Sequence, residues 1–255
     1  MELLVLSLPD DNERRARLEA SLSPYGLDYH WIKAVDARGW SDEEAACHLD
    51  HMALFFNMSY HPIPGSIGCY RSHLKAYEHL LLSDKHAAII LEDDAEITEA
   101  FASHLSCLES AAHHLDVIFL CDRRPGRPAP LIGQSHKGLA FTFKRFANIG
   151  ANGYVINRKA ARLMIDHYDK FGLEIDTLLN RWWQTGLSVA TTAPELVTHK
   201  DMGSSIGYDN IRFVTNPFRR LANSGANLKM SLTKRLLFQR HLKKMQTDFE
   251  KGKTL

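Results

Sequence analysis

The sequence has few of the residues that characterise disulfide-rich, fibrous or disordered chains. Four cysteines occur among 255 residues, and no two of them form a Cys-x-x-Cys pair. This excludes a disulfide-rich scaffold and argues against a structural zinc site made of paired cysteines. Only 15 glycines and 9 prolines are present, which excludes a collagen-like chain. Because 45% of the residues are apolar, the composition predicts a globular domain with a sizeable core.

Long apolar runs are missing as well. No stretch approaches the roughly 20 apolar residues that a helix needs to span a bilayer. The chain begins MELLVLSLPDDNERR, which has no basic lead and continues into acidic residues, unlike a signal peptide. We therefore expect a protein of the cytoplasm.

The formal net charge of +1 hides an uneven distribution. Residues 211–255 carry 11 basic and 2 acidic residues, a net +9, whereas residues 1–210 carry 20 basic and 28 acidic residues, a net −8. Apolar residues recur in the basic segment at helical spacing: Leu228, Leu232, Leu236, and then Phe238, Leu242, Met245 and Phe249. This pattern predicts a main domain over residues 1–215 and a basic amphipathic helical tail over residues 216–255.

The tail has two interpretations. Its apolar stripe and cations suit the anionic inner leaflet of a membrane, which would make the protein peripheral on the inner face of the cytoplasmic membrane. Alternatively, the helix packs against its own domain and leaves a solvated basic face. Nucleic acid is not an expected partner, because the acidic body would repel phosphates.

Apolar runs and amphipathic segments alternate along residues 1–210. The runs at residues 3–8, 87–91 and 116–121 are typical of strands buried on both faces, and residues 12–21, 65–82, 158–168 and 176–183 of helices. Ser41 and Glu44 have the spacing of a capping box, which predicts the start of a further short helix. This alternation predicts an α/β fold with a mostly parallel central sheet. Residues 122–135, rich in Arg, Pro and Gly, are expected to form a mobile loop that acts as a lid.

Three carboxylates follow one of these predicted strands directly: Glu92, Asp93 and Asp94. In open α/β sheets, ligands bind at the carboxyl edge of the strands. A divalent cation such as Mg²⁺ or Mn²⁺ would relieve the repulsion among the three charges, and such ions carry substrate phosphates on their remaining positions. The alternative is a solvated acidic turn.

This cluster is part of a longer pattern. Residues 65–74 (GSIGCYRSHL), followed about 18 residues later by residues 91–94 (LEDD), resemble glycosyltransferase family 25, which includes bacterial lipooligosaccharide and lipopolysaccharide galactosyltransferases. Residues 6–9 (LSLP) with the arginine pair at 14–15, and residues 152–157 (NGYVIN), resemble the same family. The resemblance runs from about residue 3 to residue 205.

The resemblance implies a GT-A-like nucleotide-sugar-binding fold and an inverting transfer. The donor it implies is a UDP-sugar, UDP-galactose first among them, and the acceptor is a lipid-linked lipooligosaccharide or lipopolysaccharide saccharide. Residues 92–94 would stand for the Asp-x-Asp motif, although Glu92 departs from it. Asp94 would be the direct ligand of Mn²⁺ or Mg²⁺, with Glu92 and His199 completing the shell.

The resemblance also suggests roles for other residues. Asp176 would be the general base, with an ordinary helix cap as the alternative. His73, at the start of a predicted helix, would take part in catalysis, with a structural role as the alternative. Trp182 and Trp183 would stack on sugars or lie in the core. The residues expected to contact the donor are Ser7, Leu8, Arg14, Arg15, Ser72, Glu92, Asp93, Asn152 and Gly153.

Two other functions fit the same features. A metal-dependent phosphohydrolase acting on a nucleotide would use the same acidic cluster. A non-enzymatic adaptor would use the basic tail to bind a membrane. A glycosyltransferase differs from both, because it should bind uridine diphosphate with manganese and need an acceptor for turnover.

Overall fold

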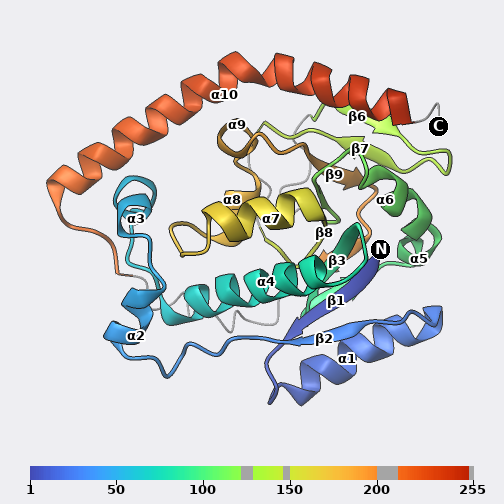
Figure 1. Cartoon of the computed structure of the whole chain (residues 1–255), viewed down its shortest axis with the longest axis horizontal. Helices are drawn as coiled ribbons and strands as arrows, with labels where there is room; N and C mark the ends of the chain where they lie inside the picture. The colour runs from blue at the N-terminus through green and yellow to red at the C-terminus, as the bar shows by residue number, and fades with distance from the viewer. Residues whose placement is uncertain (122–128, 146–149, 200–211, 253–255) are drawn as a thin grey trace.

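A computed structural model describes residues 1–121, 129–145, 150–199 and 212–252 (Figure 1). An eight-stranded sheet runs through the described part of the chain, in the order β2-β1-β3-β8-β5-β9-β7-β6. Its strands are β1 (Glu2–Ser7), β2 (His30–Lys33), β3 (Ala87–Glu92), β5 (Val117–Phe119), β6 (Leu131–Gln134), β7 (Ala140–Thr142), β8 (Gly153–Asn157) and β9 (Val189–Ala193). A second, two-stranded sheet pairs β4 (Ala95–Ile97) with β10 (Val197–His199).

Six of the eight strands in the main sheet run in one direction. Strand β1 is parallel to β2 and β3, and β5 is parallel to β9. Strand β8 lies antiparallel between β3 and β5, and β7 lies antiparallel between β9 and β6. The predicted α/β class with a mostly parallel central sheet is therefore confirmed, with two reversed strands that the sequence did not indicate.

Helices cover this sheet, as Figure 1 shows. Their bounds are α1 (Asn12–Leu22), α2 (Asp42–Cys47), α3 (His51–Asn57), α4 (Pro64–Leu82), α5 (Ala100–Ser103), α6 (Leu105–Ala111), α7 (Arg158–His167), α8 (Ile175–Leu179), α9 (Trp182–Thr185) and α10 (Pro217–Gly252). A 3₁₀ turn, Ser23–Tyr25, follows α1. Helices α4 and α7 lie side by side over the sheet.

The first turns of α4 are fixed against the segment that follows β2. A Cβ atom on Gly68 would lie 2.5 Å from the Val35 carbonyl oxygen, so only glycine permits this approach. One turn later, the Ser72 hydroxyl donates to the Gly68 carbonyl (2.7 Å) and accepts from the Val35 backbone N–H (2.8 Å). These contacts hold Cys69 and His73, which lie on the same part of α4, close to the end of β3.

Helix α10 is 36 residues long and packs on the domain at both ends. Near its start, Arg219 Nη2 donates to the Leu54 carbonyl of α3 (3.1 Å) and Asn223 is buried. Leu242, Met245 and Phe249 are buried, and the Phe249 ring occupies the space that a side chain on Gly133 would need. His241 Nε2 lies 3.1 Å from the Leu187 carbonyl oxygen. Among the described helices, none combines the length and apolar character required to cross a membrane.

The apolar residues of α10 form two faces rather than the single stripe that the sequence predicted. Leu228, Leu232 and Leu236 are 64%, 51% and 80% exposed, whereas Leu242 and Phe249 are buried. The step from Leu236 to Phe238 is two residues, or about 200° around the helix, so the two groups point in different directions. One face of the helix is therefore packed on the domain and the other is exposed, and binding of the exposed face to a membrane stays a prediction.

Two further expectations differ from the structure. Strand β6 lies inside the segment that was expected to be a loop, residues 122–135; residues 122–128 lie outside the described residues, so the lid stays a prediction. The single helix predicted over residues 176–183 is two short helices, α8 and α9. Helix α10 begins at Pro217, near the predicted boundary at residue 216, and the division into domains stays a prediction.

Candidate active site

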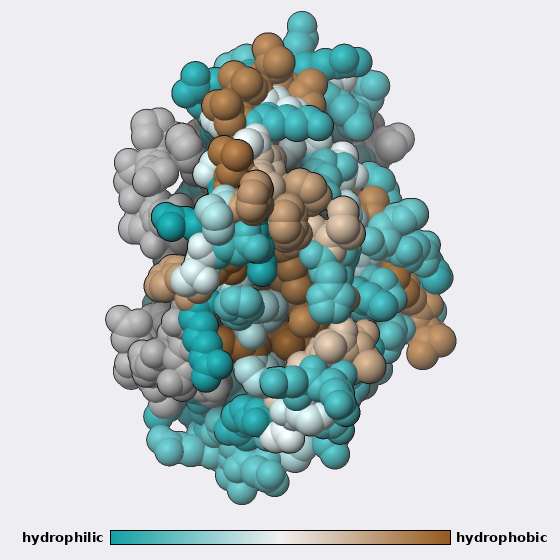
Figure 2. Space-filling model, turned by 90° about the vertical axis from the view of Figure 1, so that its left-hand side faces the viewer, coloured by the Kyte–Doolittle hydropathy of each residue, from teal (hydrophilic) through white to brown (hydrophobic). Residues whose placement is uncertain are grey.

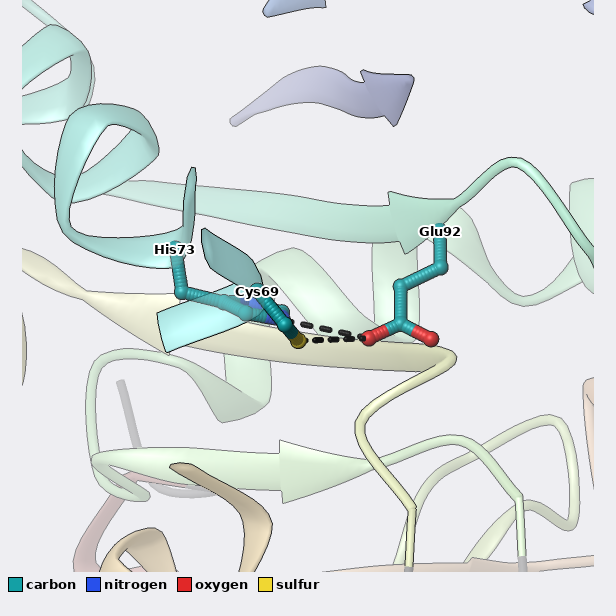
Figure 3. Close-up of side chains that lie close together, drawn as sticks. All are labelled: Cys69, His73 and Glu92. Atoms are coloured by element: carbon teal, nitrogen blue, oxygen red, sulfur yellow. Dashed lines mark hydrogen bonds and ion pairs between the residues drawn. The ribbon is translucent and has the colours of Figure 1, made fainter. Parts of the chain in front are cut away.

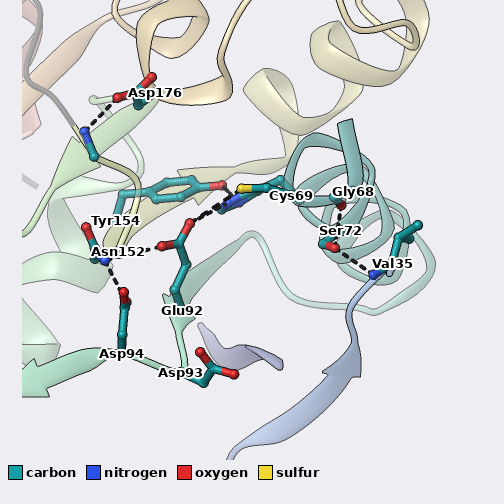
Figure 4. A network of polar contacts seen from close by, with 12 residues as sticks. Val35, Gly68, Cys69, Ser72, Glu92, Asp93, Asp94, Asn152, Tyr154 and Asp176 are labelled. Atoms are coloured by element: carbon teal, nitrogen blue, oxygen red, sulfur yellow. Dashed lines mark hydrogen bonds and ion pairs between the residues drawn. The ribbon is translucent and has the colours of Figure 1, made fainter. Parts of the chain in front are cut away.

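The side-chain amide of Asn152 lies at the centre of the site. Strand β8 pairs with β3 so that Leu91 faces Gly153, and this register places Asn152 beside the end of β3. Its Nδ2 donates to Asp94 Oδ1 (2.6 Å) and to Glu92 Oε2 (3.2 Å), as Figure 4 shows. Asn152 is almost fully buried. Its neutral amide holds the carboxylates of Glu92 and Asp94 close to each other.

The middle carboxylate of the acidic cluster points elsewhere. Asp93 lies in the turn that follows β3, and its side chain faces away from those of Glu92 and Asp94, as Figure 4 shows. Its Oδ1 accepts from Arg14 Nη1 (3.3 Å), and the Ser7 hydroxyl is a second partner. Burial raises the pKa of Asp93, although Ser7 and Arg14 act in the opposite direction. The three acidic residues therefore divide into a pair and a single group.

A chain of polar side chains approaches Glu92 from helix α4. His73 is fully buried, and its Nε2 lies 3.2 Å from Glu92 Oε1 while its Nδ1 lies 2.7 Å from the Tyr154 hydroxyl. The Tyr154 hydroxyl in turn lies 2.7 Å from that of Tyr77. Cys69 Sγ lies 3.7 Å from the same Glu92 oxygen, as Figure 3 shows. Glu92 is therefore held from two sides.

Two more carboxylates lie at the start of α8. Asp176 Oδ2 accepts from the Gly150 backbone N–H (2.7 Å), and Gly150 has φ +96°, a conformation that favours glycine. The Tyr60 hydroxyl donates to Glu174 Oε1 (3.1 Å). Burial, and then the charge of Asp176, raise the pKa of Glu174 to about 7. Asp176 is therefore held beside a carboxyl group that stays partly protonated at neutral pH.

The thiol of Cys69 is close enough to Glu92 and to the pair Glu174 and Asp176 to be affected by the charges of all three. Burial, followed by the negative charges of Glu92, Glu174 and Asp176, raises its pKa. Cys69, Glu174 and Tyr154 were not singled out from the sequence. The only signal for Glu174 was its position two residues before Asp176, because its burial and its bond to Tyr60 depend on distant parts of the chain.

Several residues that were predicted to contact the donor make other contacts in this structure. The Arg15 guanidinium lies over the Trp31 ring, 4.4 Å from its centroid. The carbonyl of Leu8 accepts from the Ser7 hydroxyl (3.2 Å), so both lie at the end of β1. The Ser72 hydroxyl is engaged by backbone groups of α4 and of the segment after β2. Their roles in donor binding stay predictions.

Other predicted residues lie around the small sheet and under α10. A Cβ atom on Gly153 would lie 2.9 Å from Val197, so β10 packs closely there. His199 ends β10 with its backbone opposite Ala95, next to Asp94, while its side chain lies outside the described residues. Trp182 is buried against the His241 ring, and Lys234 lies over the Trp183 ring. Trp182 is therefore a core residue.

The oxygen atoms of Asp94 and Glu92 fit a hard divalent ion. Carboxylate oxygens are the ligands that Mg²⁺ and Mn²⁺ prefer, and this pair converges on one amide at the carboxyl end of β3. The edge of an open α/β sheet is also where such folds bind ligands. Fold and site therefore define an α/β protein with a carboxylate site at the edge of its sheet.

Comparison with known proteins identifies the family. Residues 1–127 match the family Glycosyltransferase family 25 (LPS biosynthesis protein). A protein of Aedes aegypti described as a glycosyltransferase 25 family member is 25% identical over 128 residues, which are 48% of this chain and 21% of that protein. The chain thus matches about a fifth of the length of that relative. Its N-terminal half belongs to glycosyltransferase family 25, which confirms the resemblance seen in the sequence.

Three solved structures are similar to the chain. A glycosyltransferase involved in the glycosylation of the major capsid of PBCV-1 is 10% identical, with a TM-score of 0.44 over 89% of this chain and 98% of that one. A Drosophila β-1,4-galactosyltransferase 7 variant in complex with manganese, UDP-Gal and xylobiose is 13% identical (TM-score 0.36; 86% and 72%). The galactosyltransferase LgtC with donor and acceptor sugar analogs is 17% identical (TM-score 0.38; 75% and 73%). The predicted α/β class with a mostly parallel sheet is shown by the strands and helices themselves, and its GT-A-like character stays a prediction.

The raised pKa of Glu174 predicts a pH-dependent stability. The unfolded chain ionises this group near its ordinary value of 4.5, whereas the folded protein keeps it protonated up to about 7. The stability that Glu174 contributes is therefore complete below pH 4.5 and is lost as the pH rises to 7. We expect the stability of the wild type relative to Glu174→Gln to fall between pH 5 and pH 8, by up to about 3 kcal/mol.

Urea unfolding at the two pH values measures this difference. Glu13→Gln is the matched control, because the Glu13 side chain is exposed and pairs only with Arg17 on the surface. The control should differ from the wild type by the same small amount at both pH values. If the free energies of unfolding of the wild type and Glu174→Gln differed by the same amount at both pH values, the raised pKa of Glu174 would be contradicted.

Proposed function

We propose that this protein is a metal-dependent, inverting glycosyltransferase that moves a hexose from a UDP-sugar to a saccharide acceptor. The observation that carries this proposal is the pair of carboxylates, Glu92 and Asp94, held by Asn152 at the end of β3. This pair lies within the residues that match glycosyltransferase family 25. A lipooligosaccharide or lipopolysaccharide acceptor is supported by the family's description as an LPS biosynthesis protein, and UDP-galactose as donor by the resemblance in the sequence.

Donor binding is assigned to the carboxyl ends of β1 and β3. Asp94, with Glu92, would hold Mn²⁺ or Mg²⁺, which when bound supplies positive charge to the leaving diphosphate. Asn152 keeps both carboxylates turned to the same side. Arg14, which already faces Asp93, adds a second positive charge at the adjacent strand end.

The general base of the proposed reaction is Asp176. Inversion in a single displacement requires a group that accepts the proton of the attacking hydroxyl. Asp176 is suited to this, because the Gly150 N–H fixes one of its oxygens. Glu174, its neighbour with a pKa of about 7, stays partly protonated and so limits the repulsion on an ionised Asp176.

Measurements of turnover distinguish the proposed transferase from a phosphohydrolase and from a non-enzymatic adaptor. A phosphohydrolase would release nucleotide from UDP-galactose at a rate that does not depend on a saccharide acceptor. An adaptor without enzymatic activity would show no turnover with any donor. A transferase releases UDP much faster when an acceptor is present, and each UDP is matched by one new glycosidic bond.

The Asp94 carboxylate should be indispensable for metal-dependent turnover. We expect Asp94→Asn to reduce Mn²⁺-dependent UDP release in the presence of acceptor by at least 100-fold, because a neutral amide binds the ion far more weakly. Asp84→Asn, at an exposed carboxylate paired with Lys85, should keep wild-type turnover. Unchanged turnover in Asp94→Asn would contradict the proposed site, and a circular-dichroism spectrum shows whether the variant is folded.

Asp176 should affect the chemical step rather than donor binding. We expect Asp176→Asn to lower kcat by about 10² to 10⁴-fold, the usual contribution of a general base, while the Kd for UDP with Mn²⁺ stays within a few-fold. Single-turnover kinetics and calorimetric titration of UDP measure the two quantities. A structural role would instead lower the melting temperature and leave kcat nearly intact, and that result would exclude Asp176 as the base.

The exposed face of α10 is assigned to an anionic membrane. Five exposed apolar side chains lie within an arc of about 80° on this helix: Phe218, Leu221, Leu228, Leu232 and Leu236. We call them the α10 stripe. The exposed cations Lys229, Arg235, Arg240 and Lys243 lie beside it. Figure 2 shows apolar side chains exposed among polar ones over the α10 end of the molecule.

The charge of this helix favours lipid as the occupant over a second copy of the chain. No acidic residue occurs between Pro217 and Thr247, so two copies would bring cations together, whereas anionic headgroups would neutralise them. A membrane position also suits a lipid-linked acceptor. The inner face of the cytoplasmic membrane therefore remains the proposed location.

The α10 stripe should control binding to lipid vesicles. We expect the wild type to cosediment with phosphatidylglycerol vesicles more than with phosphatidylcholine vesicles, and less so at high salt. The triple variant Leu228→Ser, Leu232→Ser, Leu236→Ser should bind at least tenfold more weakly, because each leucine buries apolar surface worth about 1 kcal/mol or more. Leu82→Ser, at an exposed leucine outside α10, is the control. Equal binding of wild type and triple variant would contradict the assignment.

A further inference from the structure

Three different metal-binding atoms converge beside the carboxylate pair. Cys69 Sγ, His73 Nε2 and one Glu92 carboxylate oxygen all lie within 4.8 Å of one another (Figure 3). Cys69 and His73 are four residues apart on α4 and so share one face of the helix. We call this the Cys–His–Glu group. It differs in kind from the oxygen pair, because it contains a thiol and an imidazole.

The spacing of these atoms fits a tetrahedral ion. Zinc binds sulfur at about 2.3 Å and nitrogen or oxygen at about 2.0 Å, which places neighbouring ligands about 3.3 to 3.5 Å apart. The Glu92 oxygen lies 3.7 Å from the Cys69 sulfur and 3.2 Å from His73 Nε2. An ion would therefore require only small side-chain movements. Three protein ligands leave a fourth position for water, as in many zinc sites.

The surroundings also orient these ligands. The Tyr154 hydroxyl, 2.7 Å from His73 Nδ1, can accept a hydrogen bond from Nδ1–H and donate its own to the Tyr77 hydroxyl. In this tautomer the Nε2 lone pair is available to bind an ion. The other Glu92 oxygen is held by Asn152. Partners of this type on the far side of each ligand are a regular feature of metal sites.

Charge favours a divalent ion at this position. A Cys69 thiolate and the Glu92 carboxylate together balance two positive charges, and the carboxylates of Glu174 and Asp176 add negative potential nearby. Binding would release the thiol proton to solvent as the sulfur–metal bond forms. Mn²⁺ and Mg²⁺ prefer oxygen, so the thiolate selects a softer ion.

We propose that Cys69, His73 and Glu92 form a binding site for a thiophilic divalent ion of the Zn²⁺ class, on the opposite side of Glu92 from Asp94. This site does not depend on the proposed transferase activity. Because both sites use Glu92, Zn²⁺ bound here draws that carboxylate toward α4.

Cobalt reports directly on a thiolate ligand. The protein is treated with a chelator, dialysed and titrated with Co²⁺ alone. We expect a near-ultraviolet thiolate-to-cobalt band and visible bands typical of tetrahedral cobalt, which saturate near one equivalent and are abolished by Zn²⁺. Cys69→Ser should lose the near-ultraviolet band and bind Zn²⁺ at least 100-fold more weakly. Cys47→Ser, at the exposed cysteine of α2, should keep both properties.

A second variant makes the test independent of how Cys69→Ser folds. Tyr154→Phe keeps all three ligands and should weaken Zn²⁺ binding by about 10- to 100-fold, because it removes the partner of His73. Absence of the band in the wild type, its persistence in folded Cys69→Ser, or unchanged Zn²⁺ affinity in Tyr154→Phe would each overturn the proposal. None of these results bears on Mn²⁺-dependent transfer, whose loss would be seen separately as absent UDP release.

Discussion

The repulsion between Glu92 and Asp94 is the constraint on which the site depends. Glu92 ends β3 and Asp94 lies in the turn that follows, and their side chains converge on the same amide, so that their charges lie close together. The Nδ2 group of Asn152 satisfies one oxygen of each. Asn152 reaches this position only because β8 runs antiparallel to β3 and begins with Gly153 opposite Leu91. The reversed strand is therefore the feature that makes the carboxylate pair possible.

Residues of α4 contact the other side of the Glu92 carboxylate. This explains why the side chain at this position is glutamate rather than the shorter aspartate. The Asp-x-Asp motif would have the shorter side chain there, whereas in this chain the carboxylate extends to His73 and Cys69 while Asn152 holds its second oxygen. An aspartate could not span the same distance from the strand. The close approach of α4 at Gly68 is what brings these partners within reach. The departure from the motif thus follows from contacts inside this protein.

Part of this arrangement was predictable from the sequence. The apolar runs that became β1 and β3 are buried on both faces, and the capping box at Ser41 and Glu44 forms as expected. Strand direction was not predictable, because the pattern of β8 is the same in either direction. Strand β6 is a short edge strand with Leu131 exposed, so its pattern was indistinguishable from a loop.

The site was predictable to the extent that its residues carry a local pattern. The position of the carboxylates after β3 indicated a ligand-binding edge, whereas the turn that directs Asp93 away from its neighbours was not indicated. Cys69 and Glu174 carry no such pattern. Each becomes part of the site because of residues far along the chain, Glu92 for the thiol and Tyr60 for the carboxyl group.

Helix α10 connects the site to the proposed membrane surface. The 36-residue helix contacts the domain near both ends. Arg219 donates to the Leu54 carbonyl and Asn223 is buried near the start, and Leu242, Met245 and Phe249 are buried in the last third. Those contacts fix the direction of the helix, because an α-helix is stiff over this length. The α10 stripe, which lies mainly in the earlier two thirds, is consequently fixed in orientation relative to the sheet. If the stripe lies on a lipid surface, the carboxyl edge of β3 is held at a defined angle to that surface, and a lipid-linked saccharide approaches the carboxylates from a restricted set of directions. The selectivity of the enzyme for its acceptor would then depend on α10 as well as on the residues that touch the sugar.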